Sequence, residues 1–195
     1  MRRKTFDTLM ATAGLVVALV LLVAGALLAW GASFVDGQVH NQLAAQKIYF
    51  PPSNSPAIQA PEFAAMHPYA GALMTNGAQA EVYADHFIAV HLAAVAGGRT
   101  YAQVSSLAQA DPTNTKLQGQ VETLFKGTTL RSMLLNAYAF WKVGQIAGLA
   151  AVAAFVGAGL MVLLAGLGLW HSRRITPDVE LLQRQNARTP ATVAS

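Results

Sequence analysis

Two long uncharged runs constrain this chain more than any other feature of its sequence. Residues 9–32 and residues 143–170 contain no Asp, Glu, Lys or Arg, and Gln145 is the one strongly polar side chain of the second run. A helix needs roughly 20 consecutive apolar residues to cross the hydrocarbon core of a bilayer. The alternative for each run is the buried core helix of a soluble protein, but such helices average only about 10–14 residues. We therefore expect two transmembrane helices.

The composition excludes several classes of function. Charged residues make up 11% of the chain and apolar residues 54%, whereas a soluble domain carries about 25% charged residues. The formal net charge is +4, but the basic residues are concentrated toward the chain ends and do not form one patch, so we expect no nucleic-acid partner. Cysteine is absent, which excludes thiol nucleophiles, iron–sulfur clusters and zinc sites built from Cys.

Lysine and arginine also predict the orientation in the membrane. Arg2, Arg3 and Lys4 precede the first run, whereas Asp36 and a single base, Lys47, follow it. Cytoplasmic flanks of transmembrane helices carry an excess of Lys and Arg. With two spans the chain ends lie on the same side, so the sequence predicts a multi-pass protein of the plasma membrane with both termini in the cytoplasm.

The first run is expected to remain as an anchor. The apolar region of a cleaved signal peptide is usually about 7–15 residues long, and its cleavage site requires small residues. A cut after Ala32 would place the bulky Trp30 at one of those positions. The predicted order is therefore a cytoplasmic N-terminus (1–8), a transmembrane helix (9–32), an extracytoplasmic helical domain (33–142), a second transmembrane helix (143–170) and a cytoplasmic tail (171–195).

The segment between the spans has the periodicity of helices and no alternating strand pattern. Apolar residues four apart predict that the first span continues as far as Leu43, and further helices are expected over residues 76–95 and 101–110. Gly97 and Gly98 are typical of a helix end. A last helix is expected to begin near Asn114 and to merge into the second span. The predicted fold is all-α: two transmembrane helices with an extracytoplasmic helical bundle between them.

The tail contains a further helix signal and the spans contain small residues. Thr176, Pro177 and Asp178 have the order of a cap, a first-turn proline and a first-turn acid, which predicts a short helix. Small residues four apart allow helix backbones to approach closely in lipid. The candidate helix-packing residues of the spans are Gly25, Ala29, Gly144, Gly148, Ala153 and Gly157.

One group of side chains has the chemistry of a metal site. Glu81, Asp85, His86 and His91 offer two imidazoles and two carboxylates, which are ligands for zinc or iron. On a regular helix, however, His86 lies about 100° from Asp85, and His91 about 140° beyond His86. The four side chains would then point in different directions. The alternative is one core-facing histidine and a solvated acidic face, and we expect no cofactor.

Several segments together resemble a known family. They are residues 1–7, residues 46–52, residues 83–91 and residues 135–142, which read MRRKTFD, QKIYFPP, YADHFIAVH and LNAYAFWK. The chain resembles an uncharacterised family of small actinobacterial membrane proteins with two spans, and the resemblance reaches Arg174. Related chains sometimes carry a label as aromatic ring-opening dioxygenases. Such enzymes need a preformed iron site, which the diverging histidines do not supply.

The sequence contains no motif for nucleophilic catalysis, phosphate binding or dinucleotide binding. It predicts a non-enzymatic membrane protein, an accessory or assembly subunit whose partners are the bilayer and either another membrane protein or further copies of itself. The alternative is a metal-binding or ligand-sensing protein that uses His86 and His91 with Glu81 or Asp85.

Overall fold

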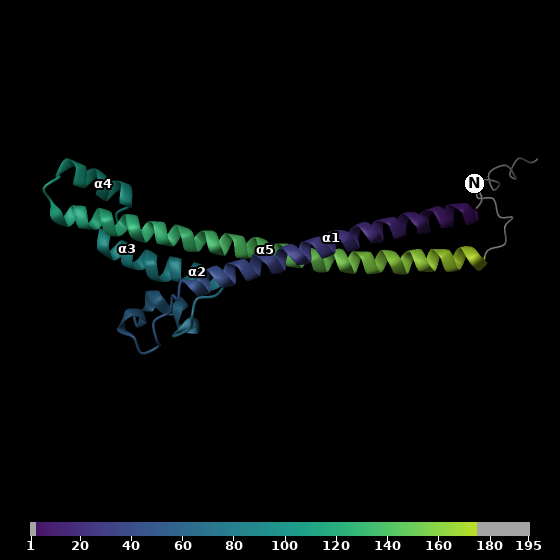
Figure 1. The fold of residues 1–195 in the computed structure, drawn as a ribbon, viewed down its shortest axis with the longest axis horizontal. Helices are drawn as coiled ribbons and strands as arrows, with labels where there is room; N and C mark the ends of the chain where they lie inside the picture. The colour runs from purple at the N-terminus through teal and green to yellow at the C-terminus, as the bar shows by residue number, and fades with distance from the viewer. Residues whose placement is uncertain (1–2, 175–195) are drawn as a thin grey trace, which may run out of the picture. The chain divides into compact units, whose positions relative to one another are not determined.

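The computed structural model describes residues 3–174, and this part of the chain is helical without a β-strand (Figure 1). A single antiparallel bridge joins Tyr49 and Leu73. The elements in chain order are α1 (Arg3–Ala45), η1 (Pro56–Ile58), η2 (Pro61–Tyr69), α2 (Gly77–Tyr83), η3 (Ala84–Ile88), α3 (Ala89–Ala96), α4 (Tyr101–Ala110) and α5 (Thr115–Arg174).

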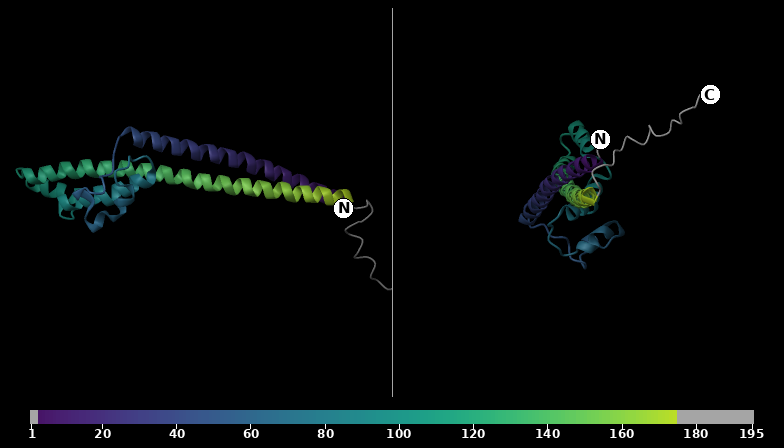
Figure 2. Two further views of the ribbon diagram at one scale, coloured as in Figure 1. Left: turned by 90° about the horizontal axis from the view of Figure 1, so that it is seen from below. Right: turned by 90° about the vertical axis from the view of Figure 1, so that its right-hand side faces the viewer.

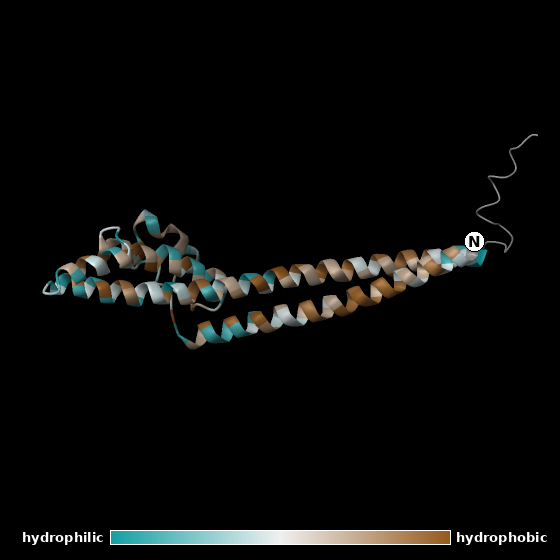
Figure 3. Cartoon of the chain, turned by 90° about the horizontal axis from the view of Figure 1, so that it is seen from above, coloured by the Kyte–Doolittle hydropathy of each residue, from teal (hydrophilic) through white to brown (hydrophobic). Residues whose placement is uncertain are grey.

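Two of these helices, α1 and α5, are long and apolar enough to cross a membrane. Both pass through two compact units of the chain. The paired-helix unit contains the residues up to Trp30 and those from Gly148 onward, and the multi-helix unit is Gly31–Ala147. Figure 3 shows hydrophobic residues concentrated along both long helices within the paired-helix unit and a more mixed pattern in the multi-helix unit.

In the paired-helix unit α1 and α5 lie side by side and antiparallel (Figures 1 and 2). A Cβ placed on Gly14 would lie 3.6 Å from Ala165 Cβ, and one placed on Gly168 would lie 3.6 Å from Ala11 Cβ. Small side chains therefore bring the two helices together, and dispersion contacts between closely packed helices are a main source of helix association in lipid.

Burial in this pair recurs every seven residues, whereas the sequence analysis considered small residues four apart. A seven-residue repeat is the period at which two helices pack as a left-handed pair. Of the candidate packing residues, Gly25 and Gly144 are buried, Ala29, Gly148 and Gly157 are partly buried, and Ala153 is exposed. The buried small residues of the repeat in the paired-helix unit are Ala11, Ala18 and Gly25 on α1 and Ala151, Ala158, Ala165 and Ser172 on α5.

A disulfide formed within one chain tests this pairing, because the chain contains no cysteine. We expect Gly14→Cys combined with Ala165→Cys to oxidise readily, since the 3.6 Å separation of the two Cβ positions lies within the roughly 3.5–4.5 Å found in disulfides. Peptide mass spectrometry under non-reducing conditions measures the yield. The matched control pairs Gly14→Cys with Gly166→Cys, because no atom lies within 4 Å of a Cβ placed on Gly166. Equal yields from both pairs would contradict the pairing.

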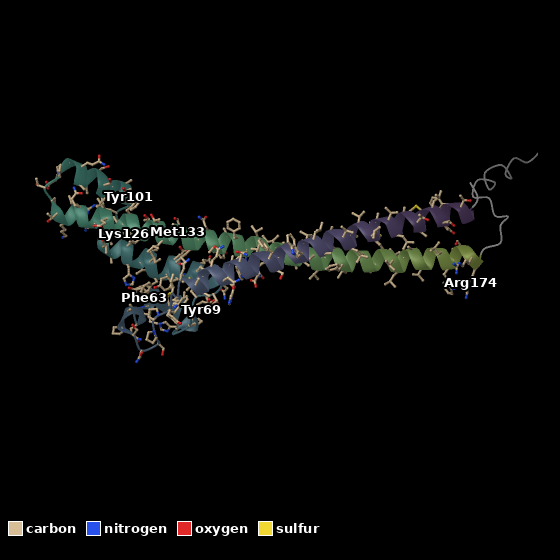
Figure 4. The ribbon with its side chains drawn as sticks, viewed as in Figure 1. Phe63, Tyr69, Tyr101, Lys126, Met133 and Arg174 are labelled. Carbon is tan, nitrogen blue, oxygen red and sulfur yellow. The ribbon has the colours of Figure 1, made fainter. Side chains whose placement is uncertain are left out.

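The core of the multi-helix unit is centred on Phe50, which follows α1 in the chain. Phe50 is 2% exposed, and its ring centroid lies 5.3 Å from those of Tyr69 and Tyr83. The short helices η1 and η2 supply further core side chains, and Figure 4 shows Phe63 and Tyr69 in this region. The buried members of the cluster are Val39, Leu43, Phe50, Ile58, Phe63, Met66, Met74, Ala80, Ala84 and Leu134.

Proline explains why the segment after α1 forms short helices. The structure forms the 3₁₀ helices η1 and η2 in this segment. Each begins with proline at its first position, where the missing N–H has no helical partner to lose. The Ser55 hydroxyl also accepts a hydrogen bond from the Ala57 amide at the start of η1.

The predicted helices of this unit are largely confirmed. Helical structure from Gly77 to Ala96 matches the predicted 76–95, Gly97 ends it in the left-handed conformation, and α4 spans the predicted 101–110. The π-helical turn η3, which interrupts the first of these helices, was not predicted. The short helix expected after Thr176 lies outside the described residues.

Candidate functional site

A large groove lies between the α1 and α5 segments of the multi-helix unit. Its volume is about 990 Å³, within the roughly 300–1,000 Å³ typical of small-molecule sites. Figures 2 and 3 show the end of α1 diverging from α5 in this region, and Figure 4 labels Met133 on the α5 side. This α1–α5 groove is lined by Phe34, Val35, Gln38, Val39, Gln42, Leu43, Gln46, Ile48, Tyr83, Phe87, Ile88, His91, Leu92, Gly127, Leu130, Met133, Leu134, Asn136, Ala137 and Phe140.

Glycines on α5 bound the groove at both of its ends. A Cβ placed on Gly144 would lie 3.1 Å from Val35 Cγ1, so α1 and α5 are in close contact there. A Cβ placed on Gly127 would overlap the Leu92 side chain of α3. The groove runs along α5 between these two contacts, and most of the side chains that line it are apolar.

The chemistry of the lining is apolar and uncharged. No Asp, Glu, Lys or Arg contributes to it. Its polar groups are the amides of Gln38 and Gln42 at the end of α1 and of Gln46 just after it, together with Asn136, His91 and Tyr83. Burial raises the pKa of the Tyr83 phenol, which favours its neutral form at physiological pH. The groove therefore offers hydrogen-bonding groups without a formal charge.

An aromatic row forms the α3 side of the groove. The rings of Tyr83 and Phe87 are 4.9 Å apart and those of Phe87 and His91 are 4.4 Å apart, between centroids. The row passes through η3, and π-helical turns inside α-helices occur frequently at functional sites.

The candidate metal ligands point to different places. Asp85 accepts hydrogen bonds from Arg131, and one ring nitrogen of His91 lies 2.8 Å from the Phe87 carbonyl oxygen. His86 is exposed, and Glu81 is partly buried. Within residues 3–174, no three His, Cys, Asp or Glu side chains form a group that could hold a metal ion. His91 is the one candidate that lines the groove.

An ion pair beside the groove was missed by the sequence analysis. Arg131 Nη2 lies 2.7 Å from Asp85 Oδ1, and Arg131 Nε lies 3.2 Å from the same oxygen. The Arg131 guanidinium thus links α5 to the π-helical turn η3. Both side chains are more than one third exposed, and solvent screening limits the contribution of such pairs to about 1 kcal/mol or less. The residues are 46 positions apart, so no local pattern could have paired them.

Comparison of the chain with protein-family models, with curated proteins and with solved structures finds no match. The resemblance to an actinobacterial two-span family therefore stays a prediction. The α1–α5 groove is the feature of the described structure from which a function is best argued.

Proposed function

We propose that this chain is a non-enzymatic protein of the plasma membrane that binds an amphiphilic molecule in the α1–α5 groove. In this proposal α1 and α5 cross the membrane, both termini are cytoplasmic, and the multi-helix unit is extracytoplasmic. The charge-free runs and the bases at residues 2–4 support that topology. The observation that carries the binding function is the apolar groove of about 990 Å³.

The position of the groove along the chain favours an amphiphile over a water-soluble ligand. Phe34, at one end of the α1 lining, lies two residues after the first apolar run, and Phe140 lies three residues before the second. In the proposed topology the groove therefore begins at the outer membrane surface. A molecule with an acyl chain could enter from the lipid without carrying its apolar part through water, which the hydrophobic effect disfavours.

A tryptophan placed in the groove tests this function. We expect Gln42→Trp to reduce the lipid that co-purifies with the protein by roughly tenfold, equivalent to about 1.4 kcal/mol of binding free energy, because the indole occupies the groove. Gentle extraction followed by mass spectrometry of organic extracts measures bound lipid per protein. The matched control is Asn41→Trp, since Asn41 is the neighbouring exposed residue and does not line the groove. Equal bound lipid in both variants would contradict the proposal.

A second candidate function is an accessory or assembly subunit of a larger membrane complex. It is favoured by a shallow depression at the α4–α5 end of the multi-helix unit, where Tyr101 and Phe125 are exposed and their ring centroids are 5.9 Å apart. Figure 4 shows Tyr101 at this end, near Lys126. Exposed aromatic residues are enriched at protein–protein interfaces.

Extraction from native membranes at natural abundance tests the accessory function. We expect a stoichiometric membrane-protein partner to co-purify with the unmodified chain and to be lost in Phe125→Ser, because serine removes an aromatic contact. Leu107→Ser is the control, since Leu107 is exposed on α4 outside the depression. Recovery of the unmodified protein as a single monodisperse chain would count against this function.

A further inference from the structure

We infer that the occupant of the α1–α5 groove is one acyl chain of a lipid whose headgroup is neutral and carries hydroxyl groups, such as an acylglycerol or a glycolipid. This inference rests on the proposed binding function and names its ligand class. It is argued from the length of the groove, the lack of Asp, Glu, Lys and Arg in its lining and the row of glutamine amides along its α1 side.

The length of the groove suits a single acyl chain. On α5 the lining runs from Gly127 to Phe140, which at 1.5 Å per residue is about 20 Å. Each leaflet of a bilayer contributes about 15 Å of the hydrocarbon core, so a chain of ordinary length spans most of the groove. Leu130, Met133 and Leu134 supply apolar contacts along it, and the flexible Met side chain adapts to irregular shapes.

The lack of charge argues against an ionised headgroup inside the groove. Gln42 and Gln46 are exposed, so a headgroup beside them keeps part of its hydration, and an ionised headgroup would be favoured there only by a cation with which to pair. No Lys or Arg lines this groove. The nearby Arg131 is outside the lining and already binds Asp85. The lining therefore offers an anionic headgroup no ion pair, whereas its amides suit a neutral headgroup.

The glutamine row matches hydroxyl groups. Gln38, Gln42 and Gln46 are four residues apart, and Gln42 Nε2 lies 3.5 Å from Gln38 Oε1. Each amide offers two donors and a carbonyl acceptor, the complement of a hydroxyl that both donates and accepts. Gln46 lies at the end of the lining away from Phe34, so the headgroup would lie near Gln42 and Gln46 with the acyl chain directed toward Phe34.

Photo-crosslinking in lipid nanodiscs tests the inference on the full-length protein. The probes are a monoacylglycerol and a fatty acid that carry the same photoactivatable acyl chain, each added to the bilayer at the same low fraction. Peptide mass spectrometry then locates the labels. We expect the monoacylglycerol to label the groove residues at least tenfold more than the fatty acid does, whereas both label the lipid-exposed residues of the long helices equally.

The variant Gln42→Leu with Gln46→Leu should reduce the preference for the monoacylglycerol to about onefold while keeping acyl-chain labelling of the groove. Asn41→Leu should leave the preference unchanged, because Asn41 does not line the groove. Equal labelling of the groove by both probes in the unmodified protein would overturn the headgroup assignment and leave the binding function standing. If neither probe labels the groove above the level at exposed Leu107, both the ligand class and the binding function are overturned.

Discussion

Replacing Phe50 by alanine is expected to destabilise the multi-helix unit by about 3–5 kcal/mol, the range for a buried Phe→Ala change. Phe50 is 2% exposed and contacts two tyrosine rings. Its backbone links the segment after α1 to the segment before α2, since the Phe50 amide donates a hydrogen bond to the Ala72 carbonyl. Removing the ring leaves a cavity between helices that few other side chains can fill.

Amide hydrogen exchange in nanodiscs measures this effect. A loss of 3–5 kcal/mol corresponds to exchange roughly 10²–10⁴-fold faster at the most protected amides of residues 48–90, because about 1.4 kcal/mol equals a factor of ten. Tyr49→Ala is the matched control: Tyr49 is adjacent in sequence but 59% exposed, and exposed side chains usually change stability by about 0.5 kcal/mol or less. Similar exchange in the two variants would show that Phe50 is not central to this core.

The second large effect is expected at Gly77, the first residue of α2. A Cβ added there would overlap Trp141 Cβ and lie 2.7 Å from Trp141 Cγ. Cβ and Cγ are the first atoms of the tryptophan side chain, and a change of rotamer moves them little. The added methyl group therefore requires α2 to shift away from α5. We expect Gly77→Ala to destabilise the multi-helix unit by about 1–3 kcal/mol, the usual cost of overpacking.

Gly119→Ala, a substitution within α5, is expected to change stability in the opposite direction. No atom lies within 4 Å of a Cβ placed on Gly119, and alanine in a helix interior is favoured over glycine by about 0.5–1 kcal/mol. This variant should therefore be neutral or stabilising. Thermal unfolding of both variants in the same detergent distinguishes the two sites. Equal changes in Tm would show that backbone propensity decides the outcome and that contact with Trp141 does not.

The long helices, the helix ends and the order of the elements were predictable because they depend on local properties. Length and hydrophobicity predict α1 and α5, and the glycines at 97 and 98 predict the end of α3. Capping boxes at Asn76 and Thr100 strengthen the starts of α2 and α4. The seven-residue spacing of Ala11, Ala18 and Gly25 was also present in the sequence, and a search at that period would have found the buried face of α1.

The α1–α5 groove depends on contacts between residues far apart in the chain. Its ends form where Gly144 meets Val35 and where Gly127 meets Leu92, and no periodic pattern shows which small residue a distant side chain will contact. The pairing of Asp85 with Arg131 and the π-helical turn it holds have the same origin. The sequence alone determined an all-helical chain with two apolar helices. The tertiary structure decided where the groove lies, because Gly144 brings α5 against α1 and Gly127 brings it against α3, and the side chains between these two contacts leave a space.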